Sequence, residues 1–90
     1  MAVYTVDARP RVRKALRQLD PTVRKDVLAK MRALATDPRP SGTKPLRGYP
    51  SWFRVRAGDY RIVYTVDDQA RVVTLADIGH RREIYRNLDL

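Results

Sequence analysis

The densest group of chemically capable side chains in this sequence is DIGHRREIYR, residues 77–86. It holds the single histidine and the single glutamate of the 90-residue chain, together with three arginines and a tyrosine. Imidazole and phenol groups transfer protons, and guanidinium groups bind phosphate oxygens. These residue types indicate chemistry on a phosphate ester, with Arg81, Tyr85 and His80 as the first candidates.

RNA cleavage is one reaction that such groups can perform without a metal or a thiol, because the 2′-hydroxyl of RNA is the nucleophile. The protein has to orient that hydroxyl, stabilise the charge that develops on the phosphate and move two protons. Arg61 and Arg81 are suited to charge stabilisation. His80 and Tyr85 are the candidates for proton transfer, although neighbouring arginines would have to lower the pKa of Tyr85 from about 10. Tyr85 could instead stack on an unpaired base, and we expect Glu83 to pair with a neighbouring arginine.

Composition and charge favour one globular domain, residues 1–90, with an anionic partner. Apolar residues make up 43% of the chain and charged residues 32%, a balance typical of a folded chain. The formal net charge of +9, with 15 arginines among 19 cationic residues, makes nucleic acid the expected partner. The sequence has no cysteine and too few His and Glu for a conventional zinc site, so we expect no metal and no cofactor. It also has no apolar run of membrane-spanning length and no signal-like N-terminus, which predicts a cytoplasmic protein.

The first half of the chain predicts a strand followed by two helices. Residues 2–6 are β-prone, and Asp7 is expected to cap a helix whose apolar residues follow helical spacing as far as Leu19. Asp20-Pro21 predicts the start of a second helix that ends near Asp37-Pro38. The short connection predicts an antiparallel helix hairpin lying on a sheet. Basic residues on the outer helix faces form either a solvated surface or additional phosphate contacts: Arg13, Arg17, Arg24, Lys25 and Lys30.

Residues 38–50, PRPSGTKPLRGYP, are rich in proline and glycine and predict a loop. Lys44 and Arg47 in this loop either solubilise the chain or contact nucleic acid. Tyr49 and Trp52 either pack against the domain or stack on bases.

The stretch WFRVRAGDYRIVYTV predicts a β-hairpin around Gly58-Asp59, because a two-residue turn that begins with glycine suits tight hairpins. That turn places Arg56 opposite Arg61 and separates the two faces of the hairpin. One face is apolar, and the other, which we call the arginine face, is cationic. The apolar face collects Phe53, Val55, Ile62 and Tyr64, and the arginine face collects Arg54, Arg56 and Arg61. Opposed like charges are unfavourable by up to about 1 kcal/mol, so a phosphate site is expected unless the long side chains separate into water.

A third strand, residues 72–78, is expected to follow a turn at 67–70. Val73 and Leu75 should join the apolar face. Val72, Thr74 and Ala76 should join the arginine face, with Ala76 opposite Arg61 and no acidic residue on that face. The fold class is therefore α+β: an N-terminal strand and a helix hairpin on a mostly antiparallel four-stranded sheet, with a short C-terminal helical tail.

The order of these motifs, KPLRG, DYRIVY and GHRREIY, resembles the RelE branch of the RelE/ParE toxin superfamily over nearly the whole chain. The resemblance implies a toxin that cleaves mRNA in the ribosomal A site and is neutralised by a cognate antitoxin protein. It also implies that the basic and tyrosine positions of a RelE-like active site are Arg54, Arg56, Arg61, Arg81 and Tyr85.

One departure from the family concerns FRVR, because RelE enzymes can carry lysines on this strand. Arginine does not lose its proton in proteins, so Arg54 and Arg56 are interpreted as electrostatic clamps. The expected catalytic residues are Arg61, Arg81, Tyr85 and His80, and the expected RNA- and phosphate-binding residues are Arg54, Arg56, Lys44, Arg47 and Arg82. Two other functions stay open, a ParE-like inhibitor that binds DNA gyrase and a non-catalytic nucleic-acid-binding module.

Overall fold

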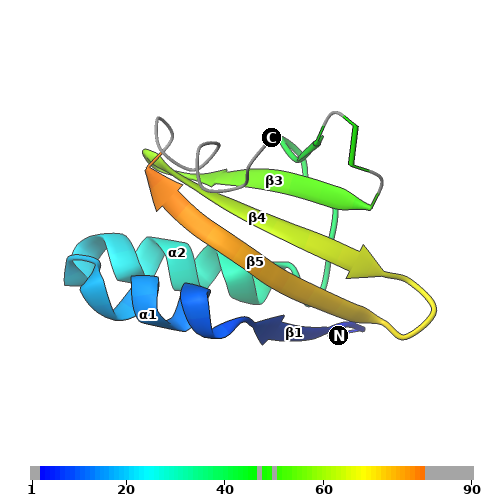
Figure 1. The fold of residues 1–90 in the computed structure, drawn as a ribbon, viewed down its shortest axis with the longest axis horizontal. Coiled ribbons are helices and arrows are strands. Elements are labelled where there is room, and N and C mark those ends of the chain that lie inside the picture. Colours follow the sequence, from blue (N-terminus) through cyan, green and yellow to red (C-terminus); the bar gives the residue numbers. More distant parts are fainter. Residues whose placement is uncertain (1–2, 47, 50, 81–90) are drawn as a thin grey trace.

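Two helices pack on one face of a five-stranded sheet in the computed structural model, which describes residues 3–46, 48–49 and 51–80 (Figure 1). The elements are β1 (Thr5–Ala8), α1 (Pro10–Gln18), α2 (Pro21–Ala33), β2 (Lys44–Pro45), β3 (Trp52–Ala57), β4 (Tyr60–Asp67) and β5 (Val72–His80). The strand order is β1-β5-β4-β3-β2, parallel for β1 with β5 and antiparallel elsewhere. The predicted α+β class is confirmed, and the sheet has one strand more than expected. The predicted helical tail lies outside the described residues.

The first helix begins at Pro10, whereas Asp7 was predicted to be its N-cap residue. Asp7 lies within β1, which stays paired with β5 as far as Ala8, and its carboxylate is 3.5 Å from the Arg13 guanidinium. Arg9 is the N-cap residue and Pro10 opens the helix. The proline decides the start, because its fixed φ suits the first helical position.

The second helix has Asp20 at its N-cap and Pro21 at its first position, as predicted, and it ends at Ala33. Arg24 of this helix holds the end of the first one. Its Nε donates to the carbonyl of Leu16 and an Nη to that of Leu19, both at 2.8 Å. Carbonyls at a helix C-terminus lack intrahelical partners, so this arginine stabilises the hairpin.

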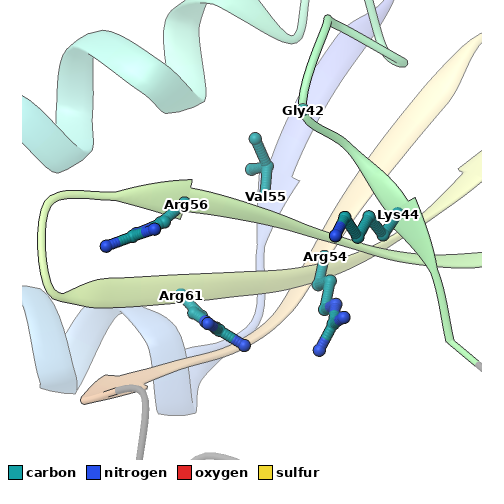
Figure 2. Close-up of a pocket in the computed structure, with 6 residues that line it drawn as sticks. All are labelled: Gly42, Lys44, Arg54, Val55, Arg56 and Arg61. Atoms are coloured by element: carbon teal, nitrogen blue, oxygen red, sulfur yellow. The ribbon is translucent and has the colours of Figure 1, made fainter.

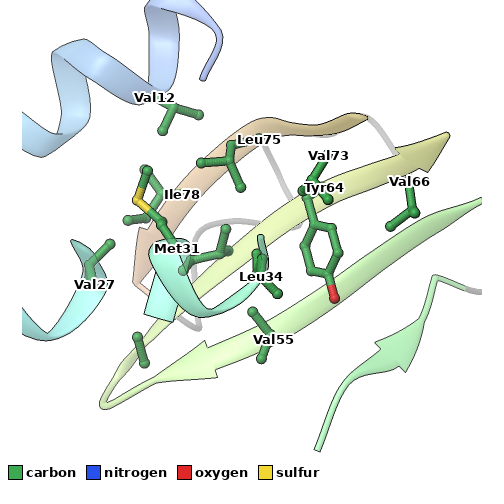
Figure 3. Packing of buried hydrophobic residues seen from close by; sticks show 12 residues of the cluster. Val12, Val27, Met31, Leu34, Val55, Tyr64, Val66, Val73, Leu75 and Ile78 are labelled. Atoms are coloured by element: carbon green, nitrogen blue, oxygen red, sulfur yellow. The ribbon is translucent and has the colours of Figure 1, made fainter. Parts of the chain in front are cut away.

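The core lies between the helices and the apolar face of the sheet (Figure 3). Its fully buried members include Val12, Val27 and Leu34 from the helical side and Ile62 and Leu75 from the sheet. Each such side chain contributes about 1.5–3 kcal/mol relative to the exposed state. None of the helices among the described residues is long and apolar enough to cross a membrane.

The β3–β4 hairpin has the predicted register, with Arg56 opposite Arg61 and Val55 opposite Ile62. Gly58 has φ +61°, a conformation that L side chains rarely adopt. The tight turn is therefore possible because a glycine occupies its first position.

The pairing of β4 with β5 differs from the expected one. The turn is displaced because Asp67 Oδ1 accepts the backbone N–H groups of Gln69 and Ala70, so that Asp67 pairs with Val72. This shift of two residues keeps Val73 on the apolar face, where it is buried.

A β-bulge then changes the register again. Tyr64 lies opposite Leu75, whereas Val63 lies opposite Asp77, and Ala76 is the extra residue. Two expectations are therefore wrong. Gly79, and not Ala76, faces Arg61, and an acidic residue does lie on the arginine face.

Candidate active site

A pocket of about 260 Å³ lies on the arginine face (Figure 2). The described residues that line it are Gly42, Lys44, Arg54, Val55, Arg56 and Arg61. Four of the six are cationic, and they come from three adjacent strands, β2, β3 and β4. Four residues that the sequence predicted as phosphate or catalytic groups are therefore brought together.

The hairpin determines how three of these cations point. Arg54 and Arg61 project to the same side of the sheet, while Val55 projects toward the helices (Figure 2). Arg56 donates its Nε to the carbonyl of Gly58 at 3.1 Å, which holds its guanidinium beside the turn. Arginine has five N–H donors, so the terminal nitrogens of Arg56 remain suited to an anion.

The fourth cation, Lys44, comes from the segment that was predicted to be loop throughout. Two residues of that segment form β2, and Lys44 lies directly opposite Arg54. Gly42, with φ +92°, allows the sharp turn that precedes the strand.

Buried hydrogen bonds attach this segment to the core. The Tyr64 hydroxyl donates to the carbonyl of Pro38 at 2.7 Å, and the Thr43 hydroxyl lies 3.4 Å from the same phenol oxygen. Burial raises the pKa of Tyr64, so this phenol stays protonated as a donor. The residue before Lys44 is thus fixed from inside the domain.

A second anchor lies further along the same segment. Arg39 donates to both carboxylate oxygens of Asp68, at 2.9 and 3.2 Å, and lies 5.1 Å from the ring centroid of Phe53. Tyr4 donates to the same carboxylate at 2.6 Å. These hydrogen bonds, from Arg39 first, lower the pKa of Asp68, and the bond to Asp68 raises the pKa of Tyr4.

Asp77 is a buried carboxylate that the sequence did not assign to this face. Val63 lies opposite Arg54 on one side and opposite Asp77 on the other, so the three side chains are on the same face of the sheet. Asp77 is 3% exposed. Oδ1 accepts the backbone N–H of Ile78 at 2.8 Å and lies 3.8 Å from Nε of Arg11. Within the described part of the chain, Oδ2 has no hydrogen-bond partner. Strand alternation carries no signal for the bulge that places it here.

His80 is directed away from the arginine pocket. It pairs with Tyr60 across β4 and β5, and their ring centroids are 5.8 Å apart in an edge-on arrangement. Tyr60 packs against the main core, so the imidazole is on the helix-covered face of the sheet. The structure does not bring His80 together with the arginines.

The remaining predicted residues divide into two groups. Trp52 packs beside Leu46 and Val63 in a small apolar cluster, and Tyr49 is 39% exposed. Four predicted site residues lie outside the described ranges: Arg47, Arg81, Arg82 and Tyr85. In the described ranges, no three His, Cys, Asp or Glu side chains form a group that could hold a metal ion.

Comparison with known proteins assigns the chain to a family. The model of the ParE toxin of type II toxin-antitoxin systems matches residues 3–85. The mRNA interferase toxin RelE of Escherichia coli K12 is 35% identical over 86 residues, which cover 91% of this chain and 90% of that protein. The chain belongs to the RelE/ParE family of toxins.

Solved structures of RelE/ParE toxins with their antitoxins agree with the fold. The archaeal RelE–RelB complex from Pyrococcus horikoshii OT3 matches with a TM-score of 0.79 at 27% identity, over 88% of this chain and 96% of that one. The RelBE2 toxin–antitoxin complex from Mycobacterium tuberculosis matches with a TM-score of 0.77 at 31% identity, over 90% and 94%. The family resemblance drawn from the motifs is confirmed, and the site chemistry has to distinguish a RelE-like toxin from a ParE-like one.

Proposed function

We propose that this toxin is a ribosome-dependent endoribonuclease that cleaves mRNA in the ribosomal A site. The observation that carries the proposal is the pocket that Lys44, Arg54, Arg56 and Arg61 line. Phosphodiester cleavage by a 2′-hydroxyl concentrates negative charge on the phosphate in the transition state. Preorganised cations stabilise that charge more than the charge of the ground state, which is the condition for catalysis.

The ribosome has a role in this proposal because the cationic pocket is open to solvent. Messenger RNA on the ribosome can present a single strained phosphate to these residues in a fixed orientation, and orientation of reactants is worth several orders of magnitude in rate. Arg81 and Tyr85 of the GHRREIY motif are proposed to complete the site, as they would in RelE-like enzymes. The curated relative that is named an mRNA interferase supports this assignment.

Control of the toxin is proposed to come from a cognate antitoxin. The two solved relatives described above are toxin–antitoxin complexes, and a net charge of +9 favours a partner with acidic surface. Such a partner would protect the cell by covering or distorting the arginine face.

Cleavage on programmed ribosomes tests the proposal. The purified toxin should cut ribosome-bound mRNA within the A-site codon and leave free mRNA largely intact. A combined Arg61→Ala, Arg81→Ala, Tyr85→Phe variant should leave both intact. Cleavage that persists unchanged in this variant would show that the assigned residues are not the active site.

A ParE-like function is the second candidate, because the matching family model is named for ParE. It predicts intact mRNA together with double-strand DNA breaks and an SOS response after expression in cells. A toxin that acts by binding gyrase has no need for four cations that line one pocket, so the cationic lining favours RNA chemistry.

A further inference from the structure

Proton donation is the part of the reaction that the arginines of the pocket cannot supply. A guanidinium keeps its protons throughout the accessible pH range, and β3 presents arginines at both outward positions of FRVR. Among the described lining residues, Lys44 is the one with a readily transferable proton. We propose that Lys44 is the general acid of the cleavage reaction, giving its proton to the leaving 5′-oxygen. This inference rests on the proposed RNA cleavage and adds a proton-transfer step to a residue predicted only as a phosphate contact.

The placement of Lys44 suits a donor at the edge of a phosphate site. It lies opposite Arg54 in the β2–β3 pair, so its side chain leaves the sheet on the arginine face. The Lys44 side chain runs along the sheet toward β3, and its ammonium group ends next to the base of the Arg54 side chain (Figure 2). Lys44 lines the same pocket as Arg54 and Arg61, so a phosphate bound in that pocket would have Lys44 at its edge.

Hydrogen bonds hold the backbone immediately before Lys44, although this segment is exposed and rich in proline. Tyr64 contacts Pro38 and Thr43 from the core, and the Pro40 carbonyl accepts the N–H of Thr43 at 3.0 Å. A general acid has to stay within hydrogen-bond reach of the atom it protonates, so a fixed backbone immediately before it favours this role.

The reaction balances with Lys44 as acid. The 2′-oxygen forms a bond to phosphorus while its proton passes to a water molecule. The bond between phosphorus and the 5′-oxygen breaks, and that oxygen takes a proton from the Lys44 ammonium. The products are a 2′,3′-cyclic phosphate and a 5′-hydroxyl, and the neutral amine regains a proton from solvent.

Two other titratable groups near the pocket are less well placed for this step. His80 lies on the helix-covered face with Tyr60. Asp77 is 3% exposed and is separated from Arg54 by Val63. Tyr85 is outside the described residues, and the experiment treats it as an alternative donor.

Replacement of the leaving oxygen by sulfur tests for a general acid directly. A thiolate leaves without a proton, so a linkage with a 5′-bridging sulfur does not need the donor. Single-turnover cleavage on programmed ribosomes is measured for the normal and the sulfur-containing mRNA. The variant is Lys44→Arg, which keeps the charge, and the matched control is Lys14→Arg, an exposed lysine of α1.

The proposal expects Lys44→Arg to slow cleavage of the normal mRNA by about 10²-fold, a typical general-acid contribution, and to cleave the sulfur-containing mRNA at nearly the wild-type rate. Lys14→Arg should match wild type on both. Equal slowing of Lys44→Arg on both substrates would make Lys44 a phosphate clamp, and no slowing on either would assign the proton to another group such as Tyr85. Wild-type toxin that leaves ribosome-bound mRNA intact contradicts the proposed function itself, which separates the two failures.

Discussion

Arg39 and Arg56 are both exposed arginines, yet the structure surrounds them differently. Arg39 donates to both oxygens of Asp68 and covers the ring of Phe53. Arg56 lies opposite another arginine, Arg61, in a pocket lined by four cations. The first arginine belongs to a neutralised network, and the second contributes to a concentrated positive field.

The difference separates an arginine with a structural role from one that we propose to bind phosphate. A carboxylate partner cancels the long-range field of Arg39 and leaves a directional contact that joins Tyr4, which precedes β1, the segment after α2 and the β4–β5 turn. Four cations that line one pocket add their fields at that place, and the summed field attracts phosphate. The chain has 15 arginines, so whether a carboxylate lies next to an arginine says more about the role of that arginine than its residue type does.

The largest expected effect is that of Arg61→Ala on cleavage. Loss of one preorganised donor to a developing anion typically lowers the rate by about 10²–10³-fold, and we expect a fall of this size in ribosome-dependent cleavage. The free energy of unfolding should change by less than about 1 kcal/mol, because the side chain is not part of the hydrophobic core. Arg32→Ala, an exposed arginine of α2, is the control that should leave cleavage unchanged. Near-normal cleavage by Arg61→Ala would show that Arg61 does not stabilise the charge that develops on the phosphate.

An intermediate effect is expected for Tyr64→Phe, which tests whether a buried hydrogen bond holds the segment before Lys44. The substitution keeps the buried ring and removes the hydroxyl that donates to the Pro38 carbonyl, leaving that buried acceptor without its donor. We expect a loss of about 1–3 kcal/mol in the free energy of unfolding, measured by urea denaturation. Cleavage should also fall, because the segment before Lys44 loses its anchor. A variant as stable as wild type would show that the bond does not hold this segment.

The arginine face was predictable from the sequence because the turn between β3 and β4 determines which residues share that face. Gly58-Asp59 sets a two-residue hairpin, and the hairpin alone determines that Arg56 meets Arg61. Lys44 was recognised as a candidate, but its place opposite Arg54 was not, because a two-residue strand in a proline-rich segment has no periodic signal.

The acidic residue of the arginine face was not predictable for a different reason. Asp77 reaches that face through the bulge at Ala76, and an alternating apolar pattern does not show where an extra residue is inserted. The same shift places Gly79 opposite Arg61 and turns His80 toward Tyr60. One inserted residue therefore decided which of the polar groups before the C-terminus could share a face with the arginines.

The smallest effect is expected for Asp68→Asn, and its size depends on pH. The asparagine can still accept hydrogen bonds from Arg39 and Tyr4, so the substitution mainly removes the charge. The pKa of Asp68 is lowered in the folded state by the hydrogen bond from Arg39, so its contribution to stability is present above the unfolded value of about 4 and is lost as pH falls through the folded value. Wild type should therefore be slightly more stable than Asp68→Asn at pH 7, with the difference vanishing under strongly acidic conditions and weakening at high salt, because the carboxylate is largely exposed. Thermal unfolding of both proteins across this pH range measures the difference. A gap that stays constant with pH would mean that neutralisation of Arg39 does not stabilise the fold, and the contrast between the two arginines would then rest on the pocket alone.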